Sequence, residues 1–207
     1  MQFETHELLK VPRSTGVLLT SLPNDIFTEI TTQVNFIVKN KKLAGKLSSN
    51  VYPIGGQISD QISFSVKKNL LHYLGNLVNH YENFYDISSA NNIVQHFAWL
   101  NLQKKYEYNP NHNHNGDLSY VIYVKVPYNL QDEDNMPNTI NSNVSANGRF
   151  CFNYVNEENK VAFKVIDITK DFEGKIMMFP SHLVHCVYPF YTSDEYRITI
   201  AGNIWYK

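Results

Sequence analysis

Apolar residues recur at helical spacing along one stretch in the first half of the chain, between about residues 65 and 86. The positions that follow this spacing are Leu70, Leu71, Leu74, Leu77, Val78, Tyr81, Phe84 and Tyr85. Intervals of three or four residues place such side chains on one face, so we predict an amphipathic helix. His72 and His80 lie in the same stretch. We interpret both as helix residues, because no acidic residue or cysteine is spaced to join them as metal ligands.

The pattern changes after about residue 92, where short runs of β-branched and aromatic residues are separated by turn residues. The runs are "IVQHFAWLNLQ", "LSYVIYVKVP", "GRFCFNYV", "KVAFKVIDI", "GKIMMFP", "LVHCVYPF" and "EYRITIAGNIWYK". Short strands at this spacing, with little helix between them, are typical of a sandwich, a jelly roll or a barrel. We therefore expect a mainly β fold with flanking helices, in the α+β class.

Nearer the N-terminus, short strand-like pieces mix with turns. "TTQVNFIVKN" alternates Val34, Phe36 and Val38 on one face, which predicts a strand. "KKLAGKL" then predicts a turn. "YPIGGQ" predicts a break in regular structure, because it combines a proline with two glycines.

A polar segment, "NLQDEDNMPNTINSNVSANG" (129–148), separates two of the predicted strands. It has too few apolar residues to pack against a core, so we expect a long exposed loop. Loops of this length in compact domains often act as lids or binding loops. A mobile surface loop without a function fits the sequence equally well.

The length and composition indicate one globular domain. The 207 residues suffice to bury a core, and 43% are apolar and 14% aromatic, which excludes a disordered chain. We expect a single domain over 1–207, with N-terminal strands and a supporting helix in 1–90 and the β core in 91–207. The formal net charge is −1 and no block of lysine or arginine occurs. We therefore expect neither a nucleic acid nor an anionic membrane as partner.

The cysteine content and the first residues bear on location. Cys151 and Cys186 do not form a CxxC pair, and we interpret them as buried free thiols rather than a disulfide framework. "MQFETHELLK" lacks the apolar core of a signal peptide, and no apolar run approaches the length of a membrane span. We predict a cytoplasmic protein in a reducing environment, and the sequence leaves the oligomeric state open.

The stretch "NPNHNHNGDLSYVIYVKVP" carries the first candidate chemistry, at the mouth of a predicted strand. Side chains two residues apart on a strand point the same way, so His112 and His114 can bind one metal ion. Asp117 follows after Asn115-Gly116, which can turn the chain. Its carboxylate could return to the same ion, or it could brace the loop as a turn cap. A His-x-His pair alone is a weak signal.

A second stretch, "GKIMMFPSHLVHCVYPF", strengthens the metal hypothesis. His185 lies within a strand-like run, and Arg197 follows twelve residues later at the start of another strand. His182 is three residues from His185 and would face away on a strand, so we interpret it as a turn or rim residue. Inside the apolar run around "RITIAGN", an inward arginine needs a buried partner, and a bound dicarboxylate would be one.

Four kinds of metal protein could use these residues. Structural zinc usually requires paired Cys and His knuckles, whereas the cysteines here are isolated. A metallo-hydrolase of the HxHxDH type would need its acid one residue earlier, and a cupin would need a glutamate where Leu118 stands. A non-haem iron oxygenase needs three protein ligands, open positions and a fixed cation for 2-oxoglutarate. Arginine suits the last role, because its planar fork matches a carboxylate.

The chain resembles the 2-oxoglutarate/Fe(II)-dependent oxygenases, and especially a group encoded by tailed phages, including cyanophages. The matching pieces, in order, are "NKKLAGKL", "NPNHNHNGDLSYVIYVKVP", "MMFPSHLVHCVYPF" and "YRITIAGN". The resemblance implies a double-stranded β-helix (jelly-roll) core with iron at its mouth. It also implies that His185 is the distal ligand and that Arg197 anchors 2-oxoglutarate. Thr199 resembles the hydroxyl that assists this arginine, and Tyr123 could supply a weaker one.

The first ligand pair departs from the family. Most members of the superfamily have His-x-Asp or His-x-Glu where this chain has His112-Asn113-His114. Either the ligands are His112, His114 and His185, or Asp117 supplies a carboxylate beside one of the pair. Spacing favours the all-histidine set, because Asp117 must come round a turn, whereas charge favours the carboxylate. We prefer the all-histidine set, with neighbouring side chains such as Asn109 and Asn115 orienting the ligands.

The implied activity is hydroxylation of a substrate with release of succinate and CO2, using Fe(II), 2-oxoglutarate and O2. The substrate would be a protein side chain or a small metabolite, in the host cytoplasm if the protein is phage-encoded. Aromatic residues such as Trp99, Tyr106, Tyr108 and Tyr120 could line the mouth, although aromatic residues on strands more often belong to the core. The alternative is a non-catalytic metal-binding, virion or host-interaction module on the same fold.

Overall fold

The computed structural model describes residues 2–12, 14–41, 57–87 and 93–206. In these ranges the strands form two antiparallel sheets. The major sheet has the order β1 (Thr5–Lys10), β2 (Gly16–Ser21), β9 (Lys175–Pro180), β6 (Leu118–Lys125), β11 (Arg197–Tyr206), β4 (Ile93–Gln103) and β3 (Gln61–Ser63). The minor sheet has the order β5 (Asn109–His112), β10 (Val184–Val187), β7 (Phe150–Val155) and β8 (Val161–Ile166).

The major sheet is buried on both faces, so its central strands are almost continuously apolar. In β6, the side chains of Leu118, Tyr120 and Ile122 belong to a core beneath the helices. Val121 and Tyr123 of the same strand belong to a second core that reaches the minor sheet. Two-residue alternation therefore decides which side chains can face a site between the sheets.

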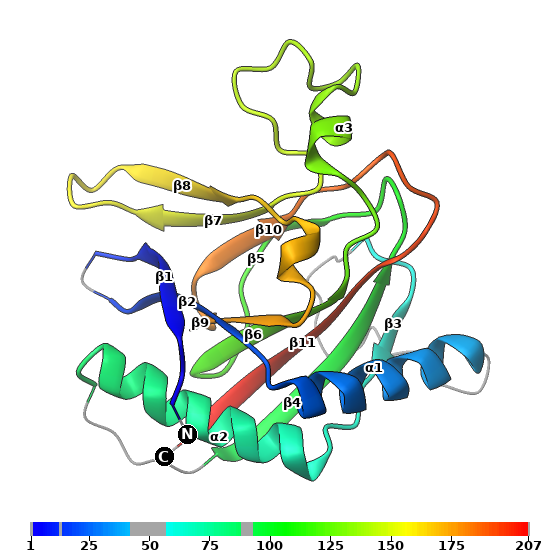
Figure 1. Ribbon diagram of the computed structural model, residues 1–207. Helices are drawn as coiled ribbons and strands as arrows, with labels where there is room; N and C mark the ends of the chain where they lie inside the picture. The colour runs from blue at the N-terminus through cyan, green and yellow to red at the C-terminus, as the bar shows by residue number, and fades with distance from the viewer. Residues whose placement is uncertain (1, 13, 42–56, 88–92, 207) are drawn as a thin grey trace.

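The helices α1 (Asn24–Lys39) and α2 (Lys68–Phe84) cover the outer face of the major sheet, and the minor sheet lies on the opposite side (Figure 1). The predicted mainly β architecture with flanking helices and a jelly-roll core is thus confirmed, as is the predicted amphipathic helix. α2 buries the predicted Leu70, Leu74, Leu77, Val78 and Tyr81.

The predicted strand over "TTQVNFIVKN" is wrong, because residues 31–39 form the second half of α1 and Asn40 is its C-cap. Phe36, taken as part of an apolar strand face, is 68% exposed. The buried residues are instead Ile26, Ile30 and Val34, which follow each other at intervals of four. The helical period becomes visible only when the residues before the quoted run are included.

The predicted strands after residue 92 and the predicted state of the cysteines agree with the structure. Each of the seven predicted runs after residue 92 contains one of the strands β4, β6, β7, β8, β9, β10 and β11. The turn predicted at "KKLAGKL" and the break predicted at "YPIGGQ" lie almost entirely outside the described residues. Cys151 and Cys186 are buried free thiols, as expected.

The polar segment 129–148 packs more closely than its composition suggests. It contains α3 (Leu130–Asp134), and Glu133 in this helix is fully buried. The Glu133 carboxylate accepts hydrogen bonds from the backbone N–H groups of Tyr191 and Thr192 and from the Thr192 hydroxyl. The expectation that the whole segment would be an unpacked loop is therefore wrong. The segment projects from the molecule (Figure 1), and Ile140 within it is 57% exposed.

Arg149 ties the end of this segment to the minor sheet. Its guanidinium binds both carboxylate oxygens of Asp134, at 2.6 and 2.9 Å, and donates from Nε to Asp167 at 2.7 Å. Hydrogen bonds from this arginine lower the pKa of the Asp134 carboxyl. The segment is thus held at the C-terminal end of α3 through the adjacent carboxylates of Glu133 and Asp134.

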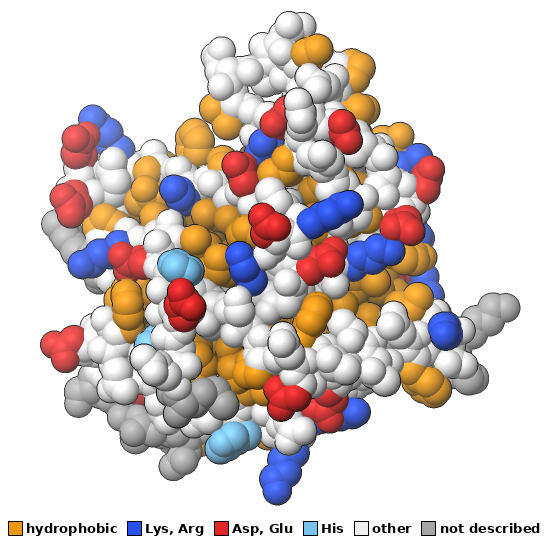
Figure 2. All heavy atoms as spheres, viewed as in Figure 1, with side chains coloured by type: hydrophobic (Ala, Val, Ile, Leu, Met, Phe, Trp, Pro, Cys, Tyr) orange, Lys and Arg blue, Asp and Glu red, His pale blue; other side chains and the backbone are white. Residues whose placement is uncertain are grey.

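Figure 2 shows the charged side chains on one face of the molecule. On the face seen in Figure 2, basic and acidic side chains are interspersed without a large area of one sign. Among the described residues, no helix is long and apolar enough to cross a membrane.

Replacing Glu133 with glutamine should destabilise the fold. The carboxamide keeps the shape but places an NH₂ group opposite N–H donors, so we expect a loss of about 2 kcal/mol in the free energy of unfolding. Chemical denaturation measures this loss. Asp132 lies beside Glu133 on the same helix but is exposed, so Asp132→Asn should change stability by less than about 0.5 kcal/mol. Equal effects of the two substitutions would contradict the role given to the Glu133 hydrogen bonds.

Candidate functional site

Two strands of the minor sheet bring together histidines that are far apart in the sequence. His112 is the last residue of β5, and His185 lies in β10. The two are direct partners in the antiparallel register, so their side chains leave the same face of the sheet. His114 follows two residues after His112, where the chain has left the strand. The structure therefore joins the three predicted histidines.

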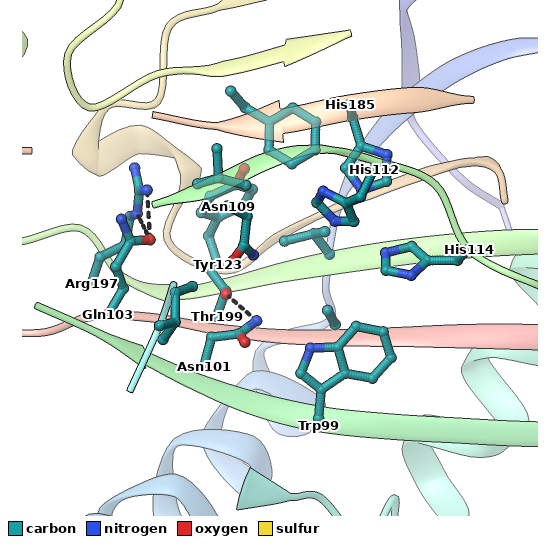
Figure 3. Close-up of a pocket in the computed structure, with 15 residues that line it drawn as sticks. Trp99, Asn101, Gln103, Asn109, His112, His114, Tyr123, His185, Arg197 and Thr199 are labelled. Carbon is teal, nitrogen blue, oxygen red and sulfur yellow. Dashed lines mark hydrogen bonds between the residues drawn. The ribbon is translucent and has the colours of Figure 1, made fainter. Parts of the chain in front are cut away.

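The three imidazoles converge on one point (Figure 3). Their potential ligand nitrogens all lie within 4.8 Å of one another, and among the described residues this is the one cluster of three or more such groups. The ring centroids of His112 and His185 are 4.2 Å apart, and those of His112 and His114 are 5.0 Å apart. These separations suit nitrogens that share one ion.

Backbone carbonyls orient two of the rings. Nδ1 of His112 lies 2.6 Å from the carbonyl oxygen of Pro110, and Nδ1 of His185 lies 2.8 Å from that of Leu183. A carbonyl oxygen can only accept a hydrogen bond, so each Nδ1 carries the proton. Each Nε2 then has a free lone pair. Histidines that bind metals commonly donate their other N–H to a carbonyl in this way.

Burial keeps the three rings neutral. Burial lowers the pKa of all three imidazoles, and it lowers the pKa of His114 to about 3. The His185 side chain is only 2% exposed. Phe150 stacks on the His185 ring with centroids 5.4 Å apart, and Phe179 meets it edge-on. The lone pairs are therefore available at neutral pH, in a largely apolar surrounding.

The structure places Asp117 away from the histidine cluster. Its Oδ2 accepts a hydrogen bond from the backbone N–H of Tyr206 at 3.0 Å. Its backbone groups bond Ile204 and Ser181. The carboxylate thus braces the loop that carries His114 against β11, through a long-range bond rather than as the local turn cap considered for it.

Close backbone contacts fix the loop between His114 and β6. The backbone N–H of His114 donates to the Ser181 carbonyl at 2.8 Å. Gly116 has φ of 119°, and a Cβ there would come within 3.1 Å of the Ile204 carbonyl oxygen. A side chain at Gly116 would therefore strain the turn and push the His114 loop off β11.

Arg197 lies at the far end of the same pocket, on the inner face of the major sheet (Figure 3). It is 2% exposed, and all its N–H groups find acceptors. Nε and Nη2 both donate to Gln103 Oε1, at 3.0 and 2.6 Å. The remaining N–H groups donate to the Tyr128 hydroxyl and to the carbonyls of Gly148 and Tyr188.

Every one of these acceptors is neutral. Among the described residues, the ion pairs include no carboxylate bound to Arg197. A buried cation without a counter-charge is costly. The site is therefore suited to an anion that comes from outside the chain.

A row of polar side chains separates Arg197 from the histidines. Thr199 is paired with Asn101 on one side and with Tyr123 on the other, so all three project from the same face. Asn101 Nδ2 donates to Thr199 Oγ1 at 3.2 Å, and burial raises the pKa of Tyr123, which keeps its hydroxyl protonated. The predicted Thr199 and Tyr123 thus line the pocket between its two ends.

Four further polar residues contribute to the site. Three of them were not predicted from the sequence, and the fourth, Asn109, was predicted only to orient the metal ligands. Gln103 and Tyr128 hold Arg197, Asn101 holds Thr199, and Asn109 lines the pocket with a buried Oδ1 that has no partner among the described residues. A signal existed for Asn101 and Gln103. They follow Trp99 at two-residue intervals in "FAWLNLQ", an otherwise apolar part of the strand, which is the pattern of a polar inner face.

Among the remaining residues named from the sequence, Trp99 lies in the pocket and four others lie outside it. Trp99 lines the pocket with its ring edge-on to His114, at 5.4 Å between centroids. Tyr120 is fully buried on the helix side of the sheet, and Tyr106 is 60% exposed. Asn115 is exposed, and His182 is exposed in the turn before β10, as predicted for a rim residue.

Comparisons with known proteins identify the family and the fold. A family model described as "Putative 2OG-Fe(II) oxygenase" matches residues 97–203. The fold resembles that of a prolyl-4-hydroxylase from Pseudomonas putida, with a TM-score of 0.59, 10% identity and 92% of each chain covered. A viral collagen prolyl hydroxylase from Paramecium bursaria Chlorella virus-1, solved with 2OG, matches with a TM-score of 0.48, 12% identity and coverage of 98% of this chain and 94% of the other. No curated protein matches the sequence.

The geometry makes the metal ligands testable. We expect His185→Ala and His114→Ala to weaken the binding of Fe(II), titrated under argon, by at least about 100-fold, because each removes one of three nitrogens. Asp117→Asn should change the affinity by less than about threefold. The control is His182→Ala, which removes an exposed imidazole three residues from His185.

Circular dichroism of each variant would separate loss of metal binding from loss of folding. If Asp117→Asn weakened metal binding as strongly as His114→Ala while the protein stayed folded, the carboxylate would be a ligand. The all-histidine set would then be wrong.

Proposed function

Because the chain belongs to the 2OG-Fe(II) oxygenase family, we propose that it is a 2-oxoglutarate-dependent dioxygenase that hydroxylates a substrate and releases succinate and CO2. The observation that carries the proposal is one pocket with two chemically different ends. Three neutral imidazoles converge at one end, and a buried guanidinium without a carboxylate partner lies at the other. A metal ion and a dicarboxylate would complete the two ends.

We assign the metal to Nε2 of His112 and of His185 and to a ring nitrogen of His114. The residues fit Fe(II), because the two oriented rings have Nδ1 engaged by carbonyls and because borderline metals accept imidazole ligands. Iron held there would supply the oxidation chemistry, coupling decarboxylation of 2-oxoglutarate by O2 to hydroxylation of the substrate. The protein's part is to orient the ligands and, through Phe150 and Phe179, to exclude water around His185.

The neutral ligand set has an electrostatic consequence. Without a carboxylate ligand, the full charge of a divalent ion is left for the co-substrate to balance. 2-Oxoglutarate is a dianion, and one of its carboxylates would meet the metal end while the other met Arg197. Counting Arg197, the dianion lowers the net charge of the metal-loaded site from +3 to +1, so we expect metal and co-substrate to strengthen each other's binding.

Arg197 is the proposed anchor, and Gln103 occupies its fork. Nε–H and an Nη2–H form the pair of donors that best matches a carboxylate, and both point to Gln103 Oε1. The cavity of about 40 Å³ has room for roughly three water-sized spheres. We propose that the co-substrate carboxylate displaces the Gln103 amide from the guanidinium, with the hydroxyls of Thr199 and Tyr123 as further donors.

The substrate is proposed by class only. We propose a protein side chain or a small metabolite, which would approach past Trp99 and His114. The net charge of −1 and the mixed charge on the face seen in Figure 2 give no support for a nucleic-acid substrate.

The function test uses absorption and product formation. Protein loaded with Fe(II) under argon should develop a weak visible band when 2-oxoglutarate is added, and should form succinate when air is admitted together with a substrate pool. His185→Ala should show neither. If the wild-type protein gives no band and no succinate with any substrate pool, the protein is a non-catalytic metal-binding module on this fold.

The anchor can be tested through Gln103. We expect Gln103→Glu to weaken 2-oxoglutarate binding at least about tenfold, because an isosteric carboxylate would pair permanently with Arg197 and compete with the co-substrate. Arg197→Ala should weaken it at least as much, and both variants should still bind metal. Calorimetric titration of the metal-loaded protein, with Zn(II) in place of iron, measures the affinity.

The matched control is Gln95→Glu, which adds the same charge to an exposed position of the same strand. It should leave 2-oxoglutarate binding within about twofold of the wild-type value. The assignment of Arg197 would be wrong if Gln103→Glu and Gln95→Glu had equal effects.

A further inference from the structure

The two cysteines of the chain lie directly opposite each other on neighbouring strands. Cys151 in β7 is the register partner of Cys186 in β10, and the Cys151 thiol donates to the Phe152 carbonyl at 3.7 Å. Directly opposed residues of antiparallel strands have Cα atoms about 4.5–5.5 Å apart. This separation lies inside the range of about 4.4–6.8 Å that a disulfide spans. The register thus gives the pair the geometry of a cross-strand disulfide while both thiols are free.

The pair lies on the face of the minor sheet that points away from the pocket. Phe150, Phe152 and His185 belong to the inner face, where their rings pack together. Cys151 and Cys186 are the intervening residues of the same strands, so their side chains point outward. A bond between the two sulfurs would add no atom to the pocket.

We propose that Cys151 and Cys186 form a reversible disulfide that links β7 to β10, a modification site distinct from the metal site and independent of the proposed function. The oxidant is a hydroperoxide such as H₂O₂. One thiol attacks the peroxide, which breaks the O–O bond, releases one water and leaves a sulfenic acid. The second thiol attacks that sulfur, forms the S–S bond and releases the second water. A dithiol reductant restores both thiols.

The bond would fasten the strand that carries His185. β10 has only four residues, and its ladder with β5 is irregular between His185 and Val187. Its pairing with β7 is regular over all four residues, and the cysteines are the third of these pairs. A covalent link there closes a long loop between distant parts of the chain, which stabilises the native state by restricting the unfolded one. The modification would therefore rigidify β10 from behind.

The chain offers no competing intramolecular pairing, because Cys151 and Cys186 are its only cysteines. Reduced, metal-free protein treated with H₂O₂ and then alkylated should lose about 2 Da, the mass of two hydrogens, and take up no alkylating agent. A digest without reductant should contain one linked pair of peptides that carry Cys151 and Cys186. Dithiothreitol should restore both alkylation sites.

The physical effect has its own readouts. Oxidation should raise the melting temperature by at least about 3 °C, and should slow amide hydrogen exchange in residues 184–187 more than in β4, which has no part in the link. Cys151→Ser and Cys186→Ser should fold as the reduced wild type does and should show neither change after the same treatment.

Three results would overturn the proposal. They are unreacted thiols under peroxide concentrations that oxidise a free thiol standard, sulfinic acid on either cysteine instead of the mass loss, and disulfides only between two molecules. A disulfide that formed without slowing exchange in β10 would contradict the proposed effect on that strand.

Discussion

His185 pairs with His112 across two short antiparallel strands, and the geometry of the site depends on this pairing. It brings together imidazoles that are 73 positions apart, on the inner face of the minor sheet. The third ring, His114, follows because the loop after β5 is held by the Ser181 carbonyl and by Asp117, whose carboxylate bonds the Tyr206 backbone N–H. Asp117 thereby acts on the site through the backbone, and the three rings form a ligand set without net charge.

The opposite wall of the pocket follows from strand alternation in the major sheet. Consecutive inward positions of β11 are Arg197, Thr199 and Ala201, and those of β4 opposite them are Gln103, Asn101 and Trp99. Polarity therefore falls step by step from the guanidinium toward the histidines. The segment 129–148 completes the arginine end, because the Gly148 carbonyl accepts from Arg197 and because Glu133 and Arg149 hold this segment in place. A segment that looks like a surface loop in the sequence thus helps to position the buried cation.

The elements that a local run or spacing of apolar residues marks could be predicted from the sequence, whereas features that depend on tertiary contacts could not. The strands after residue 92 and α2 could be recognised from spacing. α1 could not be recognised from "TTQVNFIVKN", because its helical stripe begins at Ile26 and because Phe36 is exposed. The His-x-His pair, His185 and Arg197 could be singled out by residue type. The hydrogen bonds of Gln103 and Tyr128 to Arg197, and the packing of Glu133, depend on register and on contacts between distant segments, which no local pattern encodes.

The central claim is that three neutral imidazoles and one buried guanidinium define the two ends of a single metal and co-substrate site. An anaerobic crystal structure with Fe(II) and 2-oxoglutarate, with iron located by its anomalous scattering, tests it most directly. The account predicts iron bound by nitrogens of His112, His114 and His185, with a co-substrate carboxylate on Arg197 in the place of the Gln103 amide. Iron bound through Asp117, or a co-substrate that leaves the Arg197–Gln103 contact intact, would contradict it.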